Sequence, residues 1–144
     1  MLDLPSLIGT CSRASLQIDK QFRQFEEFTV RAHEVLTGKD FQVRDIAVKL
    51  KPDAGRFSAN LLHGPEVHIV FSSHIDAQGA TRGFVKAYVR TEFSPEPYKQ
   101  LGEFSFNANG ELEERDNFGD LLEIGSGNHA AGLVLRFLQE SLKA

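Results

Sequence analysis

The stretch from Ser15 to Lys39 constrains the fold more than any other part of the chain. Its apolar residues follow one another mostly at steps of three and four positions: Ile18, Phe22, Phe25, Phe28, Ala32, Val35 and Leu36. This spacing gathers apolar side chains on one face of an α-helix, while charged residues fill the other face. We therefore predict an amphipathic helix of about six or seven turns, ended by a left-handed Gly38. Such a helix needs a second layer to cover its apolar stripe.

Alternating apolar and polar residues follow this helix and indicate short strands. The first is expected from Phe41 to Leu50, with a β-bulge near Arg44 and Asp45, where the alternation shifts by one residue. The segment KPDAGR at residues 51–56 is typical of a chain reversal. Five further strands are expected, at residues 56–63, 66–75, 83–93, 101–106 and 111–115.

The carboxy-terminal residues return to a helical repeat, preceded by Ser126 or Asn128 as a cap. Short connections between consecutive strands favour antiparallel pairing. We predict an α+β fold with a long N-terminal helix, a bent antiparallel meander of about six strands and a C-terminal helix packed on one sheet face. A length of 144 residues suits a single domain. Residues 1–11 lie outside these elements and can be irregular.

The third and fourth predicted strands make a candidate ligand-binding face. Their apolar residues share one sheet face when Ile69 pairs with Val89 and Phe71 pairs with Ala87. The opposite face then carries His68, Ser72, Lys86, Tyr88 and Arg90. This mixture suits the recognition of an anionic or aromatic group, so these five residues are the candidate ligand-binding set. The alternative is a face that is simply exposed to solvent.

Three histidines, His63, His68 and His74, lie close together in the sequence and suggest a metal site. Strand geometry argues against it, because about 20 Å separates His68 from His74 at about 3.3 Å per residue. Ligand bonds to a metal measure about 2 Å. We predict no metal site, no cofactor and no catalytic residues. GSGNHAAG at residues 125–132 lacks the ending of a phosphate-binding loop and is interpreted as a flexible entry to the last helix.

The net charge of −4 is distributed unevenly along the chain. Residues 1–90 carry 12 basic and 10 acidic side chains, whereas residues 91–144 carry 4 basic and 10 acidic ones. An acidic carboxy-terminal third repels phosphate backbones, so nucleic-acid binding is disfavoured, whereas the same charge suits a basic protein partner. Glu111, Glu113 and Glu114 are the candidate partner-binding residues. A solvated acidic surface is the alternative interpretation.

Two functional hypotheses follow. The first is a small soluble non-enzymatic interaction or adaptor protein that binds a protein partner or a second copy of itself. The second is a small-molecule-binding domain, or an enzyme, with a pocket between a helix and the curved sheet. No apolar run reaches the length of a membrane span, and the amino terminus lacks the pattern of a signal peptide. The lone Cys11 fits a reducing compartment, so we expect a cytoplasmic protein without membrane association.

Overall fold

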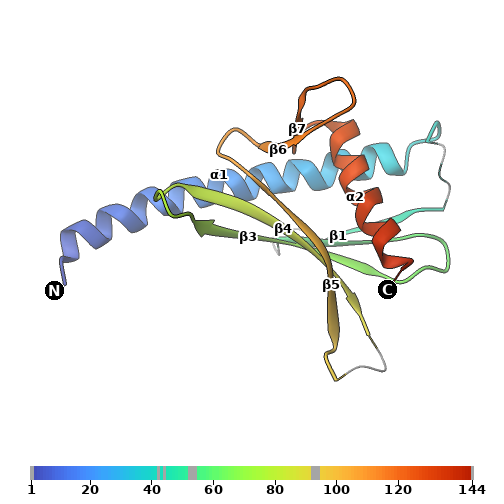
Figure 1. Ribbon diagram of the computed structural model, residues 1–144, viewed down its shortest axis with the longest axis horizontal. Coiled ribbons are helices and arrows are strands. Elements are labelled where there is room, and N and C mark those ends of the chain that lie inside the picture. Colours follow the sequence, from blue (N-terminus) through green and yellow to red (C-terminus); the bar gives the residue numbers. More distant parts are fainter. Residues whose placement is uncertain (1, 42, 44, 52–54, 92–94, 144) are drawn as a thin grey trace.

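The computed structural model describes residues 2–41, 43, 45–51, 55–91 and 95–143. Its elements are α1 (Leu4–Leu36), β1 (Ala47–Lys51), β2 (Arg56–Asn60), β3 (Val67–Ile75), β4 (Thr81–Arg90), β5 (Tyr98–Phe106), β6 (Glu111–Arg115), β7 (Leu121–Glu123) and α2 (Gly127–Ser141). The first five strands form an antiparallel sheet in the order β1-β2-β3-β4-β5 (Figure 1). The predicted α+β fold is confirmed. The sixth strand, however, leaves the meander and forms a separate hairpin with β7, which was not predicted.

Helix α1 begins earlier than predicted because its start signal precedes the apolar stripe. The Asp3 carboxylate accepts a hydrogen bond from the backbone N–H of Ser6 at 3.3 Å, and Pro5 occupies the first turn. Both are typical of a helix start, since Asp satisfies a free N–H group and Pro has none to satisfy. Residues 4–11, for which we expected an irregular conformation, are therefore helical.

The end of α1 also differs from the prediction. Its last residue is Leu36, and the Thr37 hydroxyl donates a hydrogen bond to the His33 carbonyl oxygen at 2.6 Å. Gly38 is not among the residues with a positive φ angle, so the predicted left-handed glycine stop is wrong. The helix ends instead at Thr37, its C-cap residue, whose backbone N–H and hydroxyl both donate to the His33 carbonyl oxygen.

Phenylalanine rings fill the space between the helices and the sheet face that they cover, which we call the inner face. The ring centroid of Phe28 in α1 lies 5.9 Å from that of Phe57 in β2 and 5.6 Å from that of Phe104 in β5. Phe104 stacks on Phe137 of α2 at 5.9 Å. Rings at these distances attract each other beyond the area that they bury. Both helices thus share the inner face, and α2 crosses the carboxy-terminal half of α1 (Figure 1).

Three turns between consecutive strands have the same construction. Each begins with an Asp or Asn whose side-chain oxygen accepts hydrogen bonds from the backbone N–H groups two and four residues later. Each also has a glycine with a positive φ angle just before its last residue, a conformation that other residues rarely adopt. The turns are Asp76–Ala80, Asn107–Glu111 and Asp116–Asp120. They connect β3 to β4, β5 to β6 and β6 to β7.

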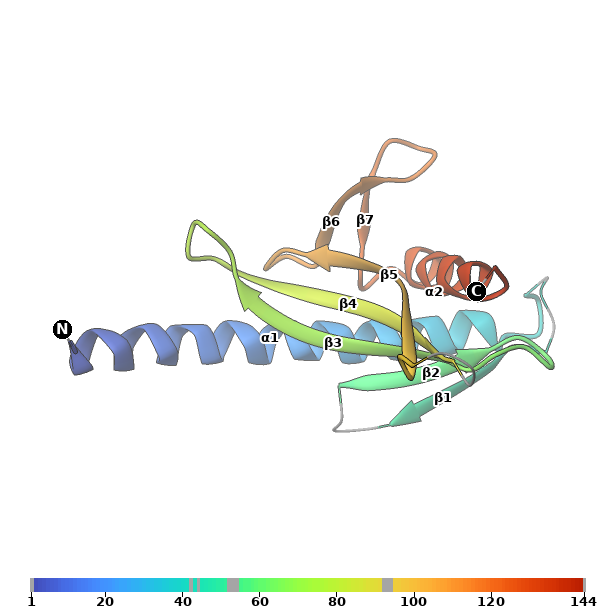
Figure 2. The same cartoon turned by 60° about the horizontal axis from the view of Figure 1, so that its bottom comes forward.

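The predicted bulge near Arg44 and Asp45 is not a feature of a strand, because β1 begins only at Ala47. Asp45 instead has a φ angle of 61°, and Arg44 lies outside the described residues. The predicted chain reversal at residues 51–56 is consistent with the antiparallel pairing of Lys51 with Arg56, and residues 52–54 within it lie outside the described residues. A bulge does occur in β5, where Leu101 is the extra residue between Gln100, which pairs with Tyr88, and Gly102, which pairs with Ala87. Strand β5 bends along its length (Figure 2), as bulged strands do.

Candidate functional site

The candidate ligand-binding residues lie on the outer face of the sheet, away from both helices. Strands β3 and β4 pair Ile69 with Ala87 and His68 with Tyr88. The predicted pairing of Ile69 with Val89 is therefore wrong by two residues. A shift of two keeps every side chain on its face, because side chains alternate with a period of two. The division of the hairpin into an apolar face and a polar face is thus as predicted.

A groove of about 510 Å³ opens on this outer face. Its lining residues come from β2, β3, β4 and β5, and from the residue that precedes β3: Arg56, Phe57, Ser58, Glu66, His68, Val70, Tyr88 and Tyr98. The bend of β5 brings Tyr98 toward β3, where its ring and the His68 ring form a T-shaped pair with centroids 6.3 Å apart and an interplanar angle of 90°. Three rings, those of His68, Tyr88 and Tyr98, therefore line one hollow.

The polar groups of this groove are not engaged with one another. Within the part of the chain that the structure describes, the side chains of Arg56, Glu66, His68 and Tyr88 make no hydrogen bond or ion pair. Arg56 and Glu66 are exposed, whereas His68 and Tyr88 are half-buried. A guanidinium, a phenol and an imidazole that have no internal partners are available to an incoming molecule.

The groove includes only two of the five candidate residues, His68 and Tyr88. Lys86 lies further along β4 and faces Glu103, with 3.9 Å between Nζ and the carboxylate. Ser72 lies 3.4 Å from the His74 ring, and Arg90 is exposed at the end of β4. The other six lining residues were not predicted: Arg56, Phe57, Ser58, Glu66, Val70 and Tyr98. Arg56 and Ser58 could have been found from the alternation of β2, had its register with β3 been known.

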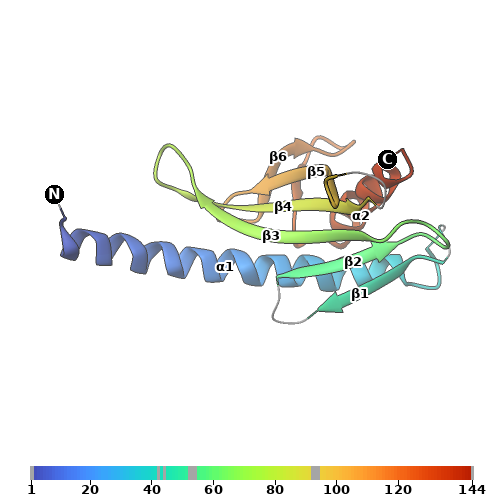
Figure 3. The same ribbon diagram turned by 90° about the horizontal axis from the view of Figure 1, so that it is seen from below.

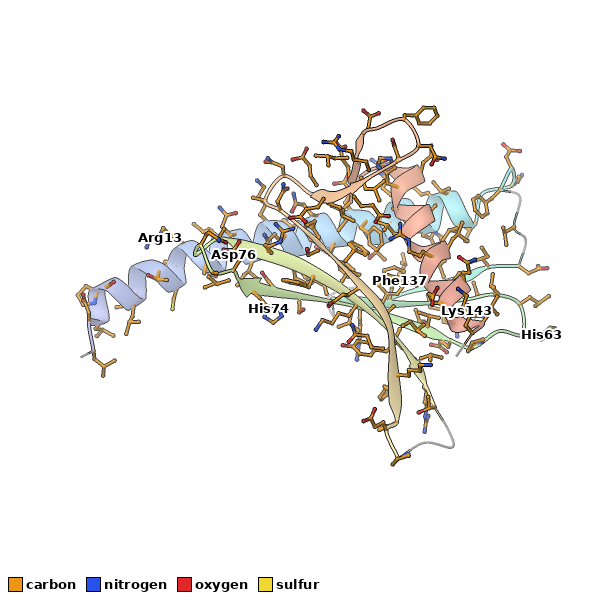
Figure 4. The ribbon with its side chains drawn as sticks, viewed as in Figure 1. Arg13, His63, His74, Asp76, Phe137 and Lys143 are labelled. Carbon is orange, nitrogen blue, oxygen red and sulfur yellow. The ribbon has the colours of Figure 1, made fainter. Side chains whose placement is uncertain are left out.

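The three clustered histidines do not meet. His63 lies in the turn before β3 and has a φ angle of 60°, and His74 lies at the opposite end of that strand (Figure 4). The His74 ring forms a T-shaped pair with the Phe84 ring, with centroids 5.2 Å apart. Among the described residues, no three His, Cys, Asp or Glu side chains are placed to hold one metal ion.

The three candidate partner-binding glutamates have different environments. Glu114 forms a double hydrogen bond with Arg136 of α2, at 2.8 and 2.9 Å. Glu111 is half-buried and accepts a weak hydrogen bond from the Asn107 amide at 3.4 Å. Glu113 is exposed. Glu113 is therefore the member of this set with the greatest access to a partner.

The β6–β7 turn is connected to α2 by a histidine–aspartate pair that sequence analysis missed. His129 of α2 places Nε2 3.0 Å from Asp116, and its Nδ1 accepts the backbone N–H of Glu123 at 3.0 Å. Because Nδ1 accepts this hydrogen bond, it carries no hydrogen of its own, so Nε2 carries the ring hydrogen and donates a hydrogen bond to Asp116. This hydrogen bond is the main cause that lowers the pKa of Asp116 below its ordinary value, and backbone donors in the turn add to it. At the tip of the turn, Phe118 is 90% exposed.

Comparison with known proteins gives no match to a family model, to a curated protein or to a solved structure. Among the described residues, no helix combines the length and the apolar character that a membrane span requires.

Proposed function

We propose that this chain is a ligand-binding protein, and that the outer-face groove receives a small molecule with an aromatic ring and one negatively charged group. The observation that carries this proposal is the unengaged Arg56 guanidinium in the same groove as the rings of His68, Tyr88 and Tyr98. A volume of about 510 Å³ falls within the range of small-molecule sites, about 300–1,000 Å³.

Each part of the groove has a chemical role in this proposal. The three rings offer faces and edges against which an aromatic ligand packs. The Arg56 guanidinium matches a carboxylate or phosphate group, with which it forms two parallel hydrogen bonds. The hydroxyls of Ser58 and Tyr88 supply further donors and acceptors. Glu66 accepts a hydrogen bond from a ligand hydroxyl or amino group and disfavours a second negative charge.

The proposal is tested by NMR titration of the labelled protein with benzoate, 4-hydroxybenzoate and the neutral analogue benzamide. We expect the two anions to shift the amide signals of Ser58, His68 and Tyr88 more strongly than benzamide does. Arg56→Ala should remove this preference for anions, and Tyr98→Ala should weaken binding of all three compounds. Lys86→Ala is the matched control, since Lys86 lies on the same face outside the groove. Equal shifts from benzoate and benzamide would exclude an anion site at Arg56.

A second candidate function is the interaction or adaptor role, in which the β6–β7 hairpin binds a basic protein partner. The observation in its favour is Phe118, whose ring is exposed on a turn that hydrogen bonds of Asp116 and His129 hold in place. A preorganised aromatic side chain contributes strongly to binding because little entropy is lost on contact. The exposed Glu113 and Asp120 nearby would favour a partner with basic residues around an apolar pocket.

This second function is tested with a photo-crosslinking amino acid placed at position 118 in cells. We expect one specific crosslinked partner, lost when Glu113→Lys reverses the charge beside it. The same amino acid at position 142, where Leu142 is also exposed, is the control. Identical crosslinks from both positions would argue against a partner site on the hairpin.

We further propose a cytoplasmic location, since the exposed Cys11 thiol is free.

A further inference from the structure

His68 lies at the centre of the outer-face groove. Strands β2, β3 and β4 run side by side in the sheet (Figure 3). In their registers His68 pairs with Ser58 on one side and with Tyr88 on the other. The ring of Tyr98 in β5 forms the T-shaped pair with the His68 ring. Each of the other three strands that line the groove thus places a lining residue beside His68.

The Arg56 guanidinium and the His68 ring can reach the same ligand group. Arg56 pairs with Val70, and His68 lies two residues before Val70 on the same face of β3. Residues in this diagonal relationship have Cα atoms about 7–8 Å apart, a distance that long side chains bridge. A carboxylate that lies between the two side chains can therefore accept hydrogen bonds from both of them.

The net charge of the groove depends on the protonation of His68. The other charged lining residues are Arg56 and Glu66, whose charges cancel. Histidine is the type of side chain that gains a proton between about pH 8 and pH 5, whereas arginine stays charged and tyrosine stays neutral over this range. With a neutral His68 the lining carries no net charge, and with a protonated His68 it carries one positive charge.

The charged groups around the groove leave His68 without an internal partner. Glu66 lies two residues from His68 on the same face, yet no hydrogen bond or ion pair joins them within the part of the chain that the structure describes. Lys86 of β4 faces Glu103 of β5, so these two charges largely cancel. Arg90, at the end of β4, is exposed and repels a protonated ring, as Glu66 attracts it. A protonated His68 therefore offers two N–H donors to a bound anion.

We infer, on the basis of the proposed function of the groove, that His68 and Arg56 bind the negatively charged group of the ligand together and that binding takes up a proton on His68. An anion binds the groove with a protonated His68 more tightly than the groove with a neutral one. The affinity for an anionic ligand is therefore higher at mildly acidic pH and falls as the pH rises through the range in which histidine loses its proton.

Calorimetric titration of the full chain with benzoate at about pH 6 and about pH 8 tests this linkage. Carboxylates such as benzoate remain ionised at both values. We expect benzoate to bind at least about fivefold more tightly at the lower pH, and the neutral analogue benzamide to bind equally at both. Between these values, titration in two buffers with different enthalpies of ionisation should show the uptake of up to one proton for each benzoate bound.

Three variants assign the proton to one side chain. His68→Gln should remove both the pH dependence and the proton uptake, because glutamine stays polar but does not ionise. His74→Gln is the matched control, since His74 lies on the same face of β3 outside the groove. Glu66→Gln should keep the pH dependence, which would exclude the carboxylate as its source. NMR spectra should show that all three variants are folded, and the proton uptake of the wild-type chain needs no variant.

The possible results separate this inference from the proposed function. At the higher pH, the preference for benzoate over benzamide depends on Arg56 alone and tests the proposed function. Benzoate that binds equally at both pH values without proton uptake, or a pH dependence that persists in His68→Gln, would overturn the inference and leave an anion site at Arg56. Benzoate that binds at neither pH would overturn both.

Discussion

The buried side chain of Gln21 joins α1 to the β3–β4 hairpin, since its Nε2 donates a hydrogen bond to the backbone oxygen of Thr81 at 2.9 Å. Its Oε1 accepts a second hydrogen bond, at 2.9 Å, from the Ser73 hydroxyl. Gln21 is the first buried residue of α1, and the buried residues that follow it are apolar apart from Thr29. The amide therefore fixes how far along the helix the sheet reaches.

Replacing Gln21 with leucine should lower the free energy of unfolding by about 1–3 kcal/mol, because the Thr81 carbonyl loses its side-chain partner in a buried place. Urea denaturation monitored by circular dichroism measures the change. Gln139→Leu, at an exposed position of α2, should have little effect. If both variants unfold at the same urea concentration, the buried hydrogen bonds of Gln21 contribute nothing.

Gly83 should not tolerate a side chain. It pairs with Phe106 in the β4–β5 ladder, and a Cβ atom at this position would lie 2.2 Å from the Phe106 ring. Phe106 is itself fully buried, so we expect Gly83→Ala to cost about 1–3 kcal/mol of stability. The double variant with Phe106→Leu should recover part of this loss, measured by thermal unfolding.

Gly132 is the matched opposite case. A Cβ atom there meets no atom within 4 Å, and the residue lies on the exposed side of α2. Gly132→Ala should stabilise the protein by about 0.5–1 kcal/mol, because alanine loses less backbone entropy in a helix. Thermal unfolding tests this prediction, and we expect a higher melting temperature for the variant. A lower melting temperature would show that α2 needs glycine at this position.

The β6–β7 turn should open in acid. The folded pKa of Asp116 lies below its unfolded value, so its contribution to stability is present above the unfolded pKa and is lost as the pH falls through the folded pKa. We expect the amide signals of Phe118 and Asp120 to keep their positions down to about pH 4 and to shift only below it. An NMR pH titration measures this. In Asp116→Asn, those shifts should disappear, and their persistence would assign them to another group.

The ion pair between Glu114 and Arg136 should contribute little to stability. Both side chains are 48% exposed, so solvent screens their attraction. A double-mutant cycle with alanine should give a coupling energy of about 0.2–1 kcal/mol, which decreases at high salt. A coupling energy that does not change with salt would indicate that the pair acts through packing instead of charge.

Strand periodicity identified the outer face of the β3–β4 hairpin correctly but not its register. The apolar pattern requires that Ile69 faces an odd-numbered residue of β4, and it does not distinguish Ala87 from Val89. The turn decides between them, because the Asp76 carboxylate binds two backbone N–H groups and sets the pair Ile75 and Thr81. The same turn pattern in Asp116–Asp120 could have predicted β7, which is too short to show alternation.

Half of the candidate groove depends on features that no local pattern reports. The place of His68 and Tyr88 on the outer face can be predicted from the alternation of apolar and polar residues within the β3–β4 hairpin. Tyr98 is placed by the extra residue Leu101, whose effect is visible only once β4 and β5 are paired. The position of Arg56 in the groove can be predicted only when the register between β2 and β3 is known, since this register pairs Arg56 with Val70. Sequence analysis therefore found the residues of one hairpin and missed those that the curvature of the sheet adds.

The neighbour-to-neighbour order of the sheet also bears on how quickly the chain folds. Every strand from β1 to β5 pairs with the strand next to it in the sequence, through short loops that cost little entropy to close. The packing of α1 on α2 instead joins the first and last elements, as at Gly127, where an added Cβ atom would lie 3.2 Å from Val35. We expect the hairpins to form early and the contact between the helices to form late, so that changes in this contact speed unfolding more than they slow folding.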